Sequence, residues 1–297
     1  MIHIPVLQKE VLKYLDPKPN KNFIDCTIGE GGHSLAILEE NKPTGKVLGI
    51  EADTEIVKKL ELQVPNSNLQ ERLILVNDSY VNLKEIVEKY NFGPIQGILF
   101  DIGMSSWHLE ESKRGFSFLR DEPLDMRYGI KAQSSLTAEE IINEWPQQEI
   151  EKILKEYGEE RFVKRITKEI IEQRKIKPIK TTFQLVEIIK KAVPFRYQRA
   201  RIHPATRTFQ ALRIAVNDEL NNLKKVLPQA MEVLASGGRI VIISFHSLED
   251  RIVKNFFKEL SSDKLKILTK KPIRASQKEI KINPRSRSAK LRAAIKL

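Results

Sequence analysis

The sequence predicts a doubly wound α/β fold that is interrupted by a mostly helical insertion. From residue 23 onward, short apolar runs alternate with helical stretches, which is the rhythm of parallel β/α units. This rhythm stops near Leu109 and resumes after Arg207. We therefore expect one α/β domain made of residues 1–108 and 208–297, with residues 109–207 inserted as a second domain.

Short apolar runs mark the expected strands, and stretches of helical periodicity follow most of them. The expected strands of the α/β domain are residues 23–27, 46–50, 73–76, 98–102 and 239–245. The expected helices between them are residues 34–40, 55–63 and 83–90. Near the N-terminus Leu7, Val11 and Leu15 share one face of an amphipathic helix.

Helical patterns without a convincing strand fill the insertion. The expected helices are residues 138–145, 147–157, 160–174 and 182–192. Thr137 is a good N-cap for the first of them.

A long amphipathic pattern returns the chain to the α/β domain. Apolar residues spaced by threes and fours run from Phe209 to Leu234, with a break or kink expected at Pro228 and an end at the glycine pair 237–238. Residues 247–250 fit a capping box that opens the next helix. The pattern predicts no path for the basic tail that follows.

Positive charge is concentrated in two segments. The 297 residues carry a net charge of +12, of which residues 161–207 supply +11 and residues 263–297 supply +10, so the remainder is −9. A single lysine-rich run is often only solvated surface. Two such segments on an otherwise acidic chain favour a polyanion partner, because each neutralised phosphate releases a counterion.

Composition also excludes several classes of protein. No run approaches the roughly 20 apolar residues of a membrane span, and no secretory signal pattern opens the chain. Cys26 is the only cysteine, and the five histidines lack metal-ligand spacing, so neither a disulfide nor a metal site is expected. We expect a cytoplasmic protein without a membrane partner, and nothing in the sequence indicates its oligomeric state.

Candidate binding residues follow the first four expected strands. Gly29, Gly31 and Gly32 stand where the first strand leads into a helix, and such glycines let a ligand approach the backbone. The dinucleotide fingerprint would need a further glycine where this chain has Ser34, which disfavours a nicotinamide oxidoreductase. A nucleoside ligand without a pyrophosphate, such as S-adenosylmethionine, makes less demand on this turn.

Acidic and aromatic residues add to this signal at the next strand ends. Glu51 closes the second strand, where nucleoside-binding folds place an acid on the ribose hydroxyls. Residues 77–80 follow the third strand and can contact an adenine edge, and Asp101 ends the fourth. The carboxyl ends of parallel strands are where open α/β sheets bind ligands.

Seven blocks in order along nearly the whole chain carry a family resemblance. They are DCTIGEGGHS, GILFDIGMSS, ESKRGFSFLRDEPLDMR, YGEERFVKRI, HPATRTFQALRIAVN, GGRIVIISFHSLEDRIVK and NPRSRSAKLR. Together they closely resemble the MraW family of ribosomal RNA small subunit methyltransferases. The resemblance implies a class I (Rossmann-like) methyltransferase fold with a helical insertion. It also implies transfer of a methyl group from S-adenosylmethionine to N4 of one cytidine in the decoding centre of small-subunit rRNA.

The resemblance also implies a set of cofactor contacts. Carried over by position, these contacts fall on Gly31, Gly32, His33, Glu51, Tyr80, Asp101 and His108. Glu51 stands where the family frequently has Asp, Tyr80 where Phe is frequent and His108 where Gln is frequent. Each replacement keeps the acid, the aromatic ring or the hydrogen-bonding capacity.

Asp101 is the candidate catalytic residue. The lone pair of a cytosine amine is delocalised into the ring, so the amine must be held with its hydrogens accepted and its lone pair aimed at the methyl group. Many amino methyltransferases use a proline-containing loop for this purpose, but residues 101–104 contain no proline. Asp101 either orients the amine or serves only as a cofactor ligand.

The basic second half of the insertion is the expected RNA-recognition surface. Its candidate phosphate contacts are Lys164, Arg165, Arg199, Arg201 and Arg207. The basic tail is the competing surface, with Arg285, Arg287 and Arg292.

Other functions remain as alternatives. One is an RNA-binding assembly protein with a non-functional cofactor pocket. Another is a DNA N4-cytosine methyltransferase, which usually carries the proline motif that is missing here. A Ser-His hydrolase is suggested by His246 and Ser247, but no G-x-S-x-G elbow exists.

Overall fold

The computed structural model describes residues 4–63, 69, 71–129 and 136–297. The chain forms two compact units, which we call the sheet unit (residues 1–103 and 220–297) and the helical unit (residues 104–219). The expected insertion, residues 109–207, lies inside the helical unit.

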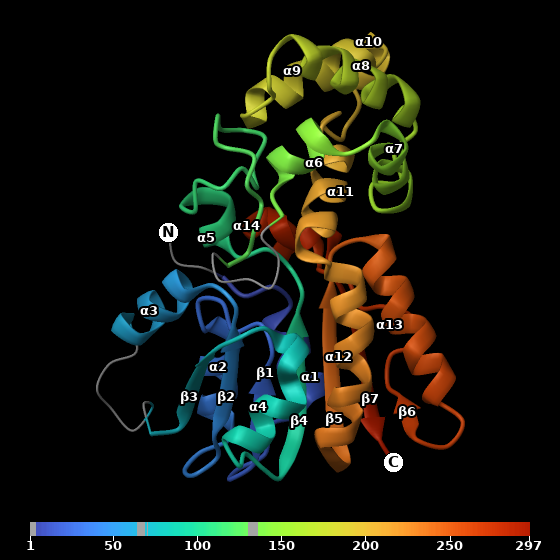
Figure 1. Cartoon of the computed structure of the whole chain (residues 1–297). Coiled ribbons are helices and arrows are strands. Elements are labelled where there is room, and N and C mark those ends of the chain that lie inside the picture. Colours follow the sequence, from blue (N-terminus) through green and yellow to red (C-terminus); the bar gives the residue numbers. More distant parts are fainter. Residues whose placement is uncertain (1–3, 64–68, 70, 130–135) are drawn as a thin grey trace. The chain divides into compact units, whose positions relative to one another are not determined.

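The sheet unit contains a seven-stranded sheet in the described residues, with the order β3-β2-β1-β4-β5-β7-β6 (Figure 1). Its strands are β1 (Asn22–Asp25), β2 (Val47–Glu51), β3 (Leu73–Asn77), β4 (Ile95–Asp101), β5 (Leu234–Ser244), β6 (Leu265–Ile267) and β7 (Lys290–Lys296). Strands β1 to β5 pair in parallel, whereas β7 runs antiparallel to both β5 and β6. This order confirms the predicted Rossmann-like class, and the chain reverses direction across the sheet at β1.

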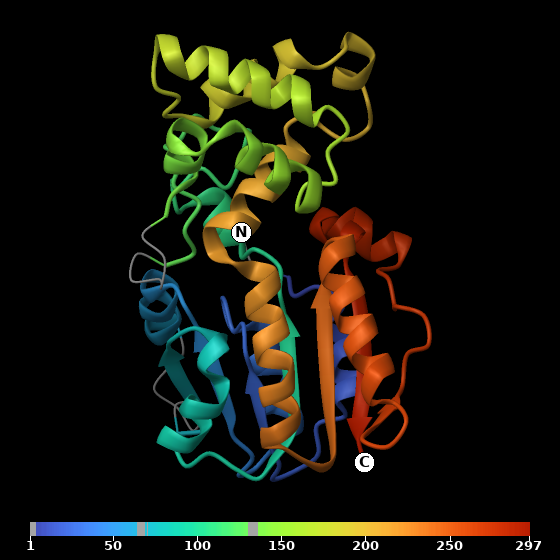
Figure 2. The same ribbon diagram turned by 45° about the vertical axis from the view of Figure 1, so that its right-hand side comes forward.

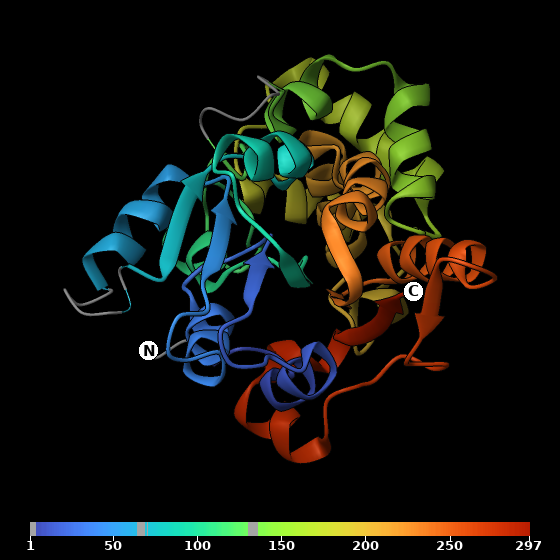
Figure 3. The same cartoon turned by 90° about the horizontal axis from the view of Figure 1, so that it is seen from below.

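Helices cover both faces of the sheet. The helices of this unit are α1 (Gln8–Leu15), α2 (Gly32–Glu40), α3 (Thr54–Gln63), α4 (Leu83–Lys89), α12 (Glu219–Val233), α13 (Ser247–Leu260) and α14 (Gln277–Ile282), with short 3-10 turns η1 (Tyr80–Asn82) and η2 (Pro284–Ser288). Figures 1 and 2 show α12 and α13 on the same face of the sheet, and Figure 3 shows α1 and α2 on the opposite face.

Successive residues of the strands point to opposite faces, as the two-residue period of a strand requires. In β4, Ile98 and Phe100 are fully buried in the core formed with α4, α12 and α13. Leu99, between them, is fully buried in the core formed with α1 and α2. A strand buried on both faces reads as a continuous apolar run, which is why β4 was recognisable in the sequence.

The long amphipathic pattern is two helices, and the break between them lies at Asp218 rather than at Pro228. Helix α11 (Thr206–Asn217) ends at Asp218, which adopts the left-handed conformation with φ 49° and caps the helix through its backbone N–H to Ile214. A left-handed residue cannot continue a right-handed helix, whereas Pro228 lies within α12. The chain passes from the helical unit to the sheet unit at this point.

The glycine pair 237–238 also has a different role from the predicted one. Strand β5 already begins at Leu234, and the pairing register with β4 shifts between Leu234 and Arg239. Gly237, with φ 75°, lies within that shift. The glycines therefore form an irregularity in a strand rather than a helix end.

The predicted capping box of α13 is shifted by one residue. His246, rather than Ser247, is the N-cap, and its side chain accepts from the backbone N–H of Glu249. The Glu249 carboxylate in turn accepts from the backbone N–H of His246 at 3.2 Å and of Phe245 at 2.8 Å. The tail, for which no path was predicted, completes the sheet as β6 and β7.

The helical unit has its own core. Its helices are α5 (Ser106–Glu110), α6 (Ala138–Glu144), α7 (Gln147–Glu156), α8 (Val163–Ile176), α9 (Thr182–Ala192), α10 (Phe195–Gln198) and α11. Thr137 caps α6 as predicted, in a capping box with Glu140. Among the residues that the structure describes, no helix is long and apolar enough to cross a membrane.

Candidate active site

A glycine turn joins β1 to α2, and Glu51 at the end of β2 holds it in place. Gly29 and Gly31 have positive φ angles of 51° and 81°, a region that favours glycine. The Glu51 carboxylate accepts from the backbone N–H of Gly29 at 3.2 Å through Oε2, and from that of Asp53 at 2.9 Å through Oε1. The predicted acid and the predicted turn are therefore brought together by a direct hydrogen bond.

The protein's own packing leaves little room for a side chain at two of these glycines. A Cβ atom on Gly31 would lie 2.9 Å from Cδ1 of Leu60, and one on Gly32 would lie 2.3 Å from Cγ of Pro5. Both distances are shorter than real Cβ contacts. The sequence interpretation explained these glycines by the approach of a ligand, whereas the structure adds an internal reason, their close packing against Leu60 and Pro5. Their contact with the cofactor stays a prediction.

A buried polar network ties β1, α2 and β4 together, and the sequence reasoning missed it. Asp25 is fully buried at the end of β1, where it accepts from the Ser34 hydroxyl at 2.8 Å and from the backbone N–H of Thr27 at 3.2 Å. The Thr27 hydroxyl accepts from the backbone N–H of Asp101 at 2.7 Å. Burial raises the pKa of Asp25, an effect that His33 and the hydrogen bonds partly oppose. The only signal in the sequence was an acid at the end of an otherwise apolar strand.

His33 and Asp101 face each other in this network with unsatisfied polar atoms. His33 Nε2 lies 3.5 Å from Asp101 Oδ2, and their side chains are 7% and 18% exposed. Both ring nitrogens of His33 and Oδ1 of Asp101 are buried without a hydrogen-bond partner among the described residues. Buried polar atoms are nearly always paired in native proteins. This cluster therefore fits a ligand that carries its own hydrogen-bonding groups.

Tyr80 follows β3 at the same edge of the sheet. Its ring packs edge-on against Phe100 of β4, with centroids 6.2 Å apart, and it lies partly buried against the core. Strands β3, β2, β1 and β4 are consecutive neighbours in the sheet, so their carboxyl ends lie side by side. The expected positions Tyr80, Glu51 and Asp101 therefore lie at one edge, together with the glycine turn.

His108 belongs to the helical unit, where its ring is enclosed by aromatic side chains. It is 4% exposed and packs against the rings of Trp107, Phe116 and Tyr128. Its Nδ1 lies 2.7 Å from the Ser105 hydroxyl. The structure gives His108 an internal role, and its contact with the cofactor stays a prediction.

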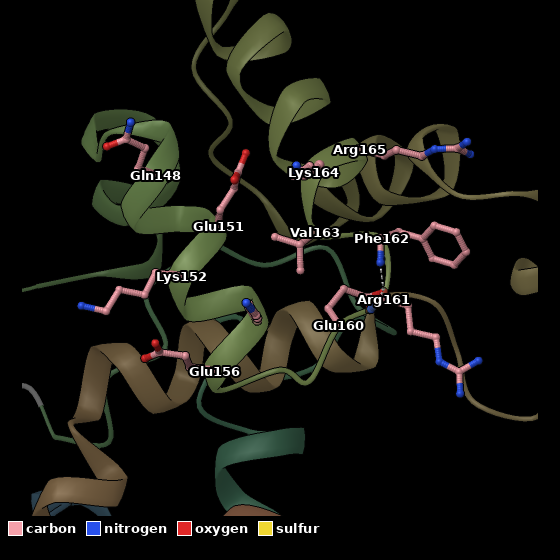
Figure 4. Close-up of a pocket in the computed structure, with 11 residues that line it drawn as sticks. Gln148, Glu151, Lys152, Glu156, Glu160, Arg161, Phe162, Val163, Lys164 and Arg165 are labelled. Carbon is pink, nitrogen blue, oxygen red and sulfur yellow. Dashed lines mark hydrogen bonds between the residues drawn. The ribbon is translucent and has the colours of Figure 1, made fainter.

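The predicted RNA contacts are spread over the helical unit. Lys164 and Arg165 are exposed in the first turn of α8, and together with residues of α7 they line a cavity of about 730 Å³ (Figure 4). Arg199 and Arg201 are exposed near α10. Arg207 donates to the carbonyl of Glu159 at 2.6 Å, so part of its function is internal.

One arginine of the competing basic tail is structural. Arg292 lies on β7, only 7% exposed, and its guanidinium pairs with the Asp250 carboxylate at 2.7 Å and 3.3 Å. The positive charge of the tail is therefore partly neutralised inside the fold, whereas Arg287 remains exposed.

Comparisons with known proteins assign the family. The MraW methylase family matches residues 1–297. The ribosomal RNA small subunit methyltransferase H of Heliobacterium mobile is 45% identical over 312 residues, covering 99% of each chain. The corresponding protein of Halothermothrix orenii is 46% identical, and the match covers 98% of this chain and 97% of the relative. That of Clostridioides difficile is 43% identical, and the match covers 99% of each chain. The match extends over the whole length, and the chain belongs to the MraW methylase family.

Proposed function

We propose that this chain transfers the methyl group of S-adenosylmethionine to small-subunit rRNA, at N4 of one cytidine in the decoding centre. Family membership supports the methyl transfer, and the relatives are named as methyltransferases of this RNA. One observation carries the choice of an amine: a buried oxygen of Asp101, at the end of β4, has no hydrogen-bond partner in the described chain. A carboxylate oxygen accepts the N–H of an exocyclic amine.

The residues present at the strand ends fit the cofactor. S-adenosylmethionine supplies an electrophilic methyl group on a sulfonium centre and carries hydroxyl, amino and carboxylate groups. The Glu51 carboxylate suits ribose hydroxyls, the Tyr80 ring suits an adenine edge, and the unpaired nitrogens of His33 suit a polar group. Gly31, Gly32 and His108 complete the proposed contacts.

Asp101 then orients the amine. When its carboxylate accepts one amine hydrogen, the amine is held against rotation and its lone pair can be directed, and such placement can supply much of a rate enhancement. The same carboxylate, with His33 at 3.5 Å, can take the proton that the amine gives up. Its backbone is fixed by the hydrogen bond to Thr27, so the acceptor is held in advance of substrate binding.

The helical unit supplies RNA recognition in this proposal. Lys164, Arg165, Arg199 and Arg201 are exposed, and the structure gives them no acidic partner in the part of the chain that it describes. Exposed cations of this kind contact phosphates. Arg207 contributes less, because it already holds a backbone carbonyl.

The experiment compares wild type with Asp101→Asn. Purified small subunits and free rRNA are each incubated with the enzyme and S-adenosylmethionine, N4-methylcytidine is quantified by mass spectrometry, and cofactor affinity is measured by calorimetry. We expect turnover to fall much more than cofactor affinity, because the amide is a weaker acceptor. Equal losses would make Asp101 only a cofactor ligand, and the absence of N4-methylcytidine with wild type would refute the proposed reaction.

A further inference from the structure

Helix α10 exposes an aromatic ring on the surface of the helical unit. Phe195, its first residue, is 63% exposed, although a phenylalanine side chain is normally buried. The guanidinium carbon of Arg199 lies 4.2 Å from the centroid of this ring, which is a cation–π distance. Phe195 and Arg199 are four residues apart and so share one face of the helix.

Two other residues of α10, Tyr197 and Gln198, anchor the helix to the unit. The Tyr197 hydroxyl donates to the Glu160 carboxylate, with distances of 3.2 Å and 3.3 Å to its two oxygens, and the Tyr197 ring packs edge-on against Phe162. The Gln198 amide donates to the carbonyl of Lys190 at 2.8 Å. Because these contacts fix the turn, the exposure of Phe195 follows from how α10 is held.

The surroundings of this ring are strongly basic. Residues 188–217 contain seven lysines and arginines and no acidic residue. Arg196, Arg199 and Arg201 are exposed and have no acidic partner among the described residues. Ile202, beside them, is 56% exposed. An apolar ring within unpaired cations matches a partner that carries both flat apolar surfaces and negative charge.

We propose that Phe195 and Arg199 form a stacking platform for one unpaired base of the RNA substrate, with Arg196 and Arg201 contacting the flanking phosphates. Every base has a π-face, so stacking needs an unstacked nucleotide but little sequence preference. A duplex offers no exposed base face to the ring. A second copy of this chain is disfavoured as the occupant, because a two-fold contact would bring the same cations together. The inference rests on the rRNA substrate of the proposed function.

The test separates stacking from charge. Binding of wild type, Phe195→Ala, Phe195→Trp and Arg201→Gln to a fluorescent single-stranded RNA, and to a duplex of the same length, is measured at several salt concentrations. We expect Phe195→Ala to lose roughly ten- to a hundredfold in affinity for the single strand at every salt concentration, with an unchanged salt slope. Phe195→Trp should keep the affinity. Arg201→Gln should flatten the slope by about 0.7 units, the value for one phosphate contact on a single strand.

Phe183 supplies the matched control, because it is another exposed phenylalanine of this unit, 46% exposed at the start of α9. Phe183→Ala should bind like wild type. The stacking platform would be overturned if Phe195→Ala kept its affinity for the single strand, or if it lost as much affinity for the duplex. It would also be overturned if light scattering showed a wild-type dimer that the Phe195→Ala substitution dissociates. Binding is measured without methyl transfer. If Phe195 proves not to stack on RNA, the proposed rRNA methylation is unaffected. If RNA binding depends on Phe195 but no methylation is detected, only the proposed function is refuted.

Discussion

Replacing Glu51 by glutamine tests whether the carboxylate at the end of β2 organises the cofactor site. The two carboxylate oxygens accept from different backbone N–H groups, those of Gly29 and Asp53. An amide of the same shape has one oxygen and one NH₂ group. Either orientation of the substituted amide therefore places a donor against a donor.

The expected loss follows from one charge-assisted hydrogen bond. Such a bond contributes about 1.5–3 kcal/mol, which corresponds to roughly a 10- to 150-fold change in an equilibrium constant. We expect the loss in affinity for S-adenosylmethionine, because Glu51 both holds the glycine turn and is the proposed ribose ligand. Calorimetric titration measures the affinity, and urea unfolding measures the stability of the same variant.

Glu55→Gln is the matched control for this substitution. Glu55 lies four residues further on, exposed at the start of α3, with Lys58 as its ion-pair partner at 3.1 Å. It should bind the cofactor within about twofold of wild type, since exposed pairs contribute little. If Glu51→Gln binds S-adenosylmethionine like wild type while its urea midpoint falls, the carboxylate is structural only and the assignment of the ribose ligand is wrong.

Two further predictions concern the helical unit. The pKa of His203 is lowered from its ordinary value of 6.5 by burial and by the charge of Lys190. The folded state therefore binds fewer protons than the unfolded state, so the free energy of unfolding should fall as the pH drops below 6.5. In urea midpoints measured across that pH range, His203→Gln should show a weaker pH dependence than wild type. Identical pH profiles of the two proteins would refute this role of His203. Neutralising Lys164 and Arg165 together should flatten the salt dependence of rRNA binding by about one unit of slope per lost contact, without changing cofactor affinity. If neutralising Arg285 and Arg287 reduced the salt dependence of rRNA binding and neutralising Lys164 and Arg165 did not, the RNA-binding surface would be assigned to the basic tail instead.

Local patterns predicted much of the fold, because they depend on neighbouring residues. The apolar runs of the first four strands and the periodicity of α6 and α9 are set by short-range rules of burial, and the structure confirms them. The predicted N-cap at Thr137 is likewise local, because its side chain accepts from the backbone N–H of Glu140, only three residues away.

Features that depend on distant residues, or on the conformation of a single residue, could not be predicted from the sequence. The antiparallel strand β7 was not predicted because its pairing with β5 joins segments about fifty residues apart, and its short Ala-rich run resembles no isolated strand. The need for glycine at position 32 comes from Pro5, which only the fold brings near. The break at Asp218 depends on a left-handed conformation, which an aspartate adopts only occasionally, so its identity does not predict the break.

The candidate site shows the same division. Its acids and glycines were found because they follow recognisable strands, whereas the network of Asp25, Thr27 and Ser34 joins strand ends to a helix through side chains. Such a network is visible only when the strands are neighbours in the sheet. The unpaired atoms of His33 and Asp101 could not be inferred at all, because satisfaction of a hydrogen bond is a property of the packed structure.

The segment after β4 contains no proline, yet its backbone is held in place around Asp101, the proposed amine acceptor. A proline would restrict the backbone through its fixed φ angle. In this chain the backbone N–H of Asp101 is held by the Thr27 hydroxyl at 2.7 Å, and that of Ile102 by the carbonyl of Ile243 at 3.1 Å. A Cβ atom on Gly103 would lie 2.6 Å from the Phe245 ring, so this ring packs directly on the backbone. Hydrogen bonds and packing therefore restrict the backbone from Asp101 to Gly103 in place of a proline ring, while one carboxylate oxygen of Asp101 stays buried without a hydrogen-bond partner among the described residues.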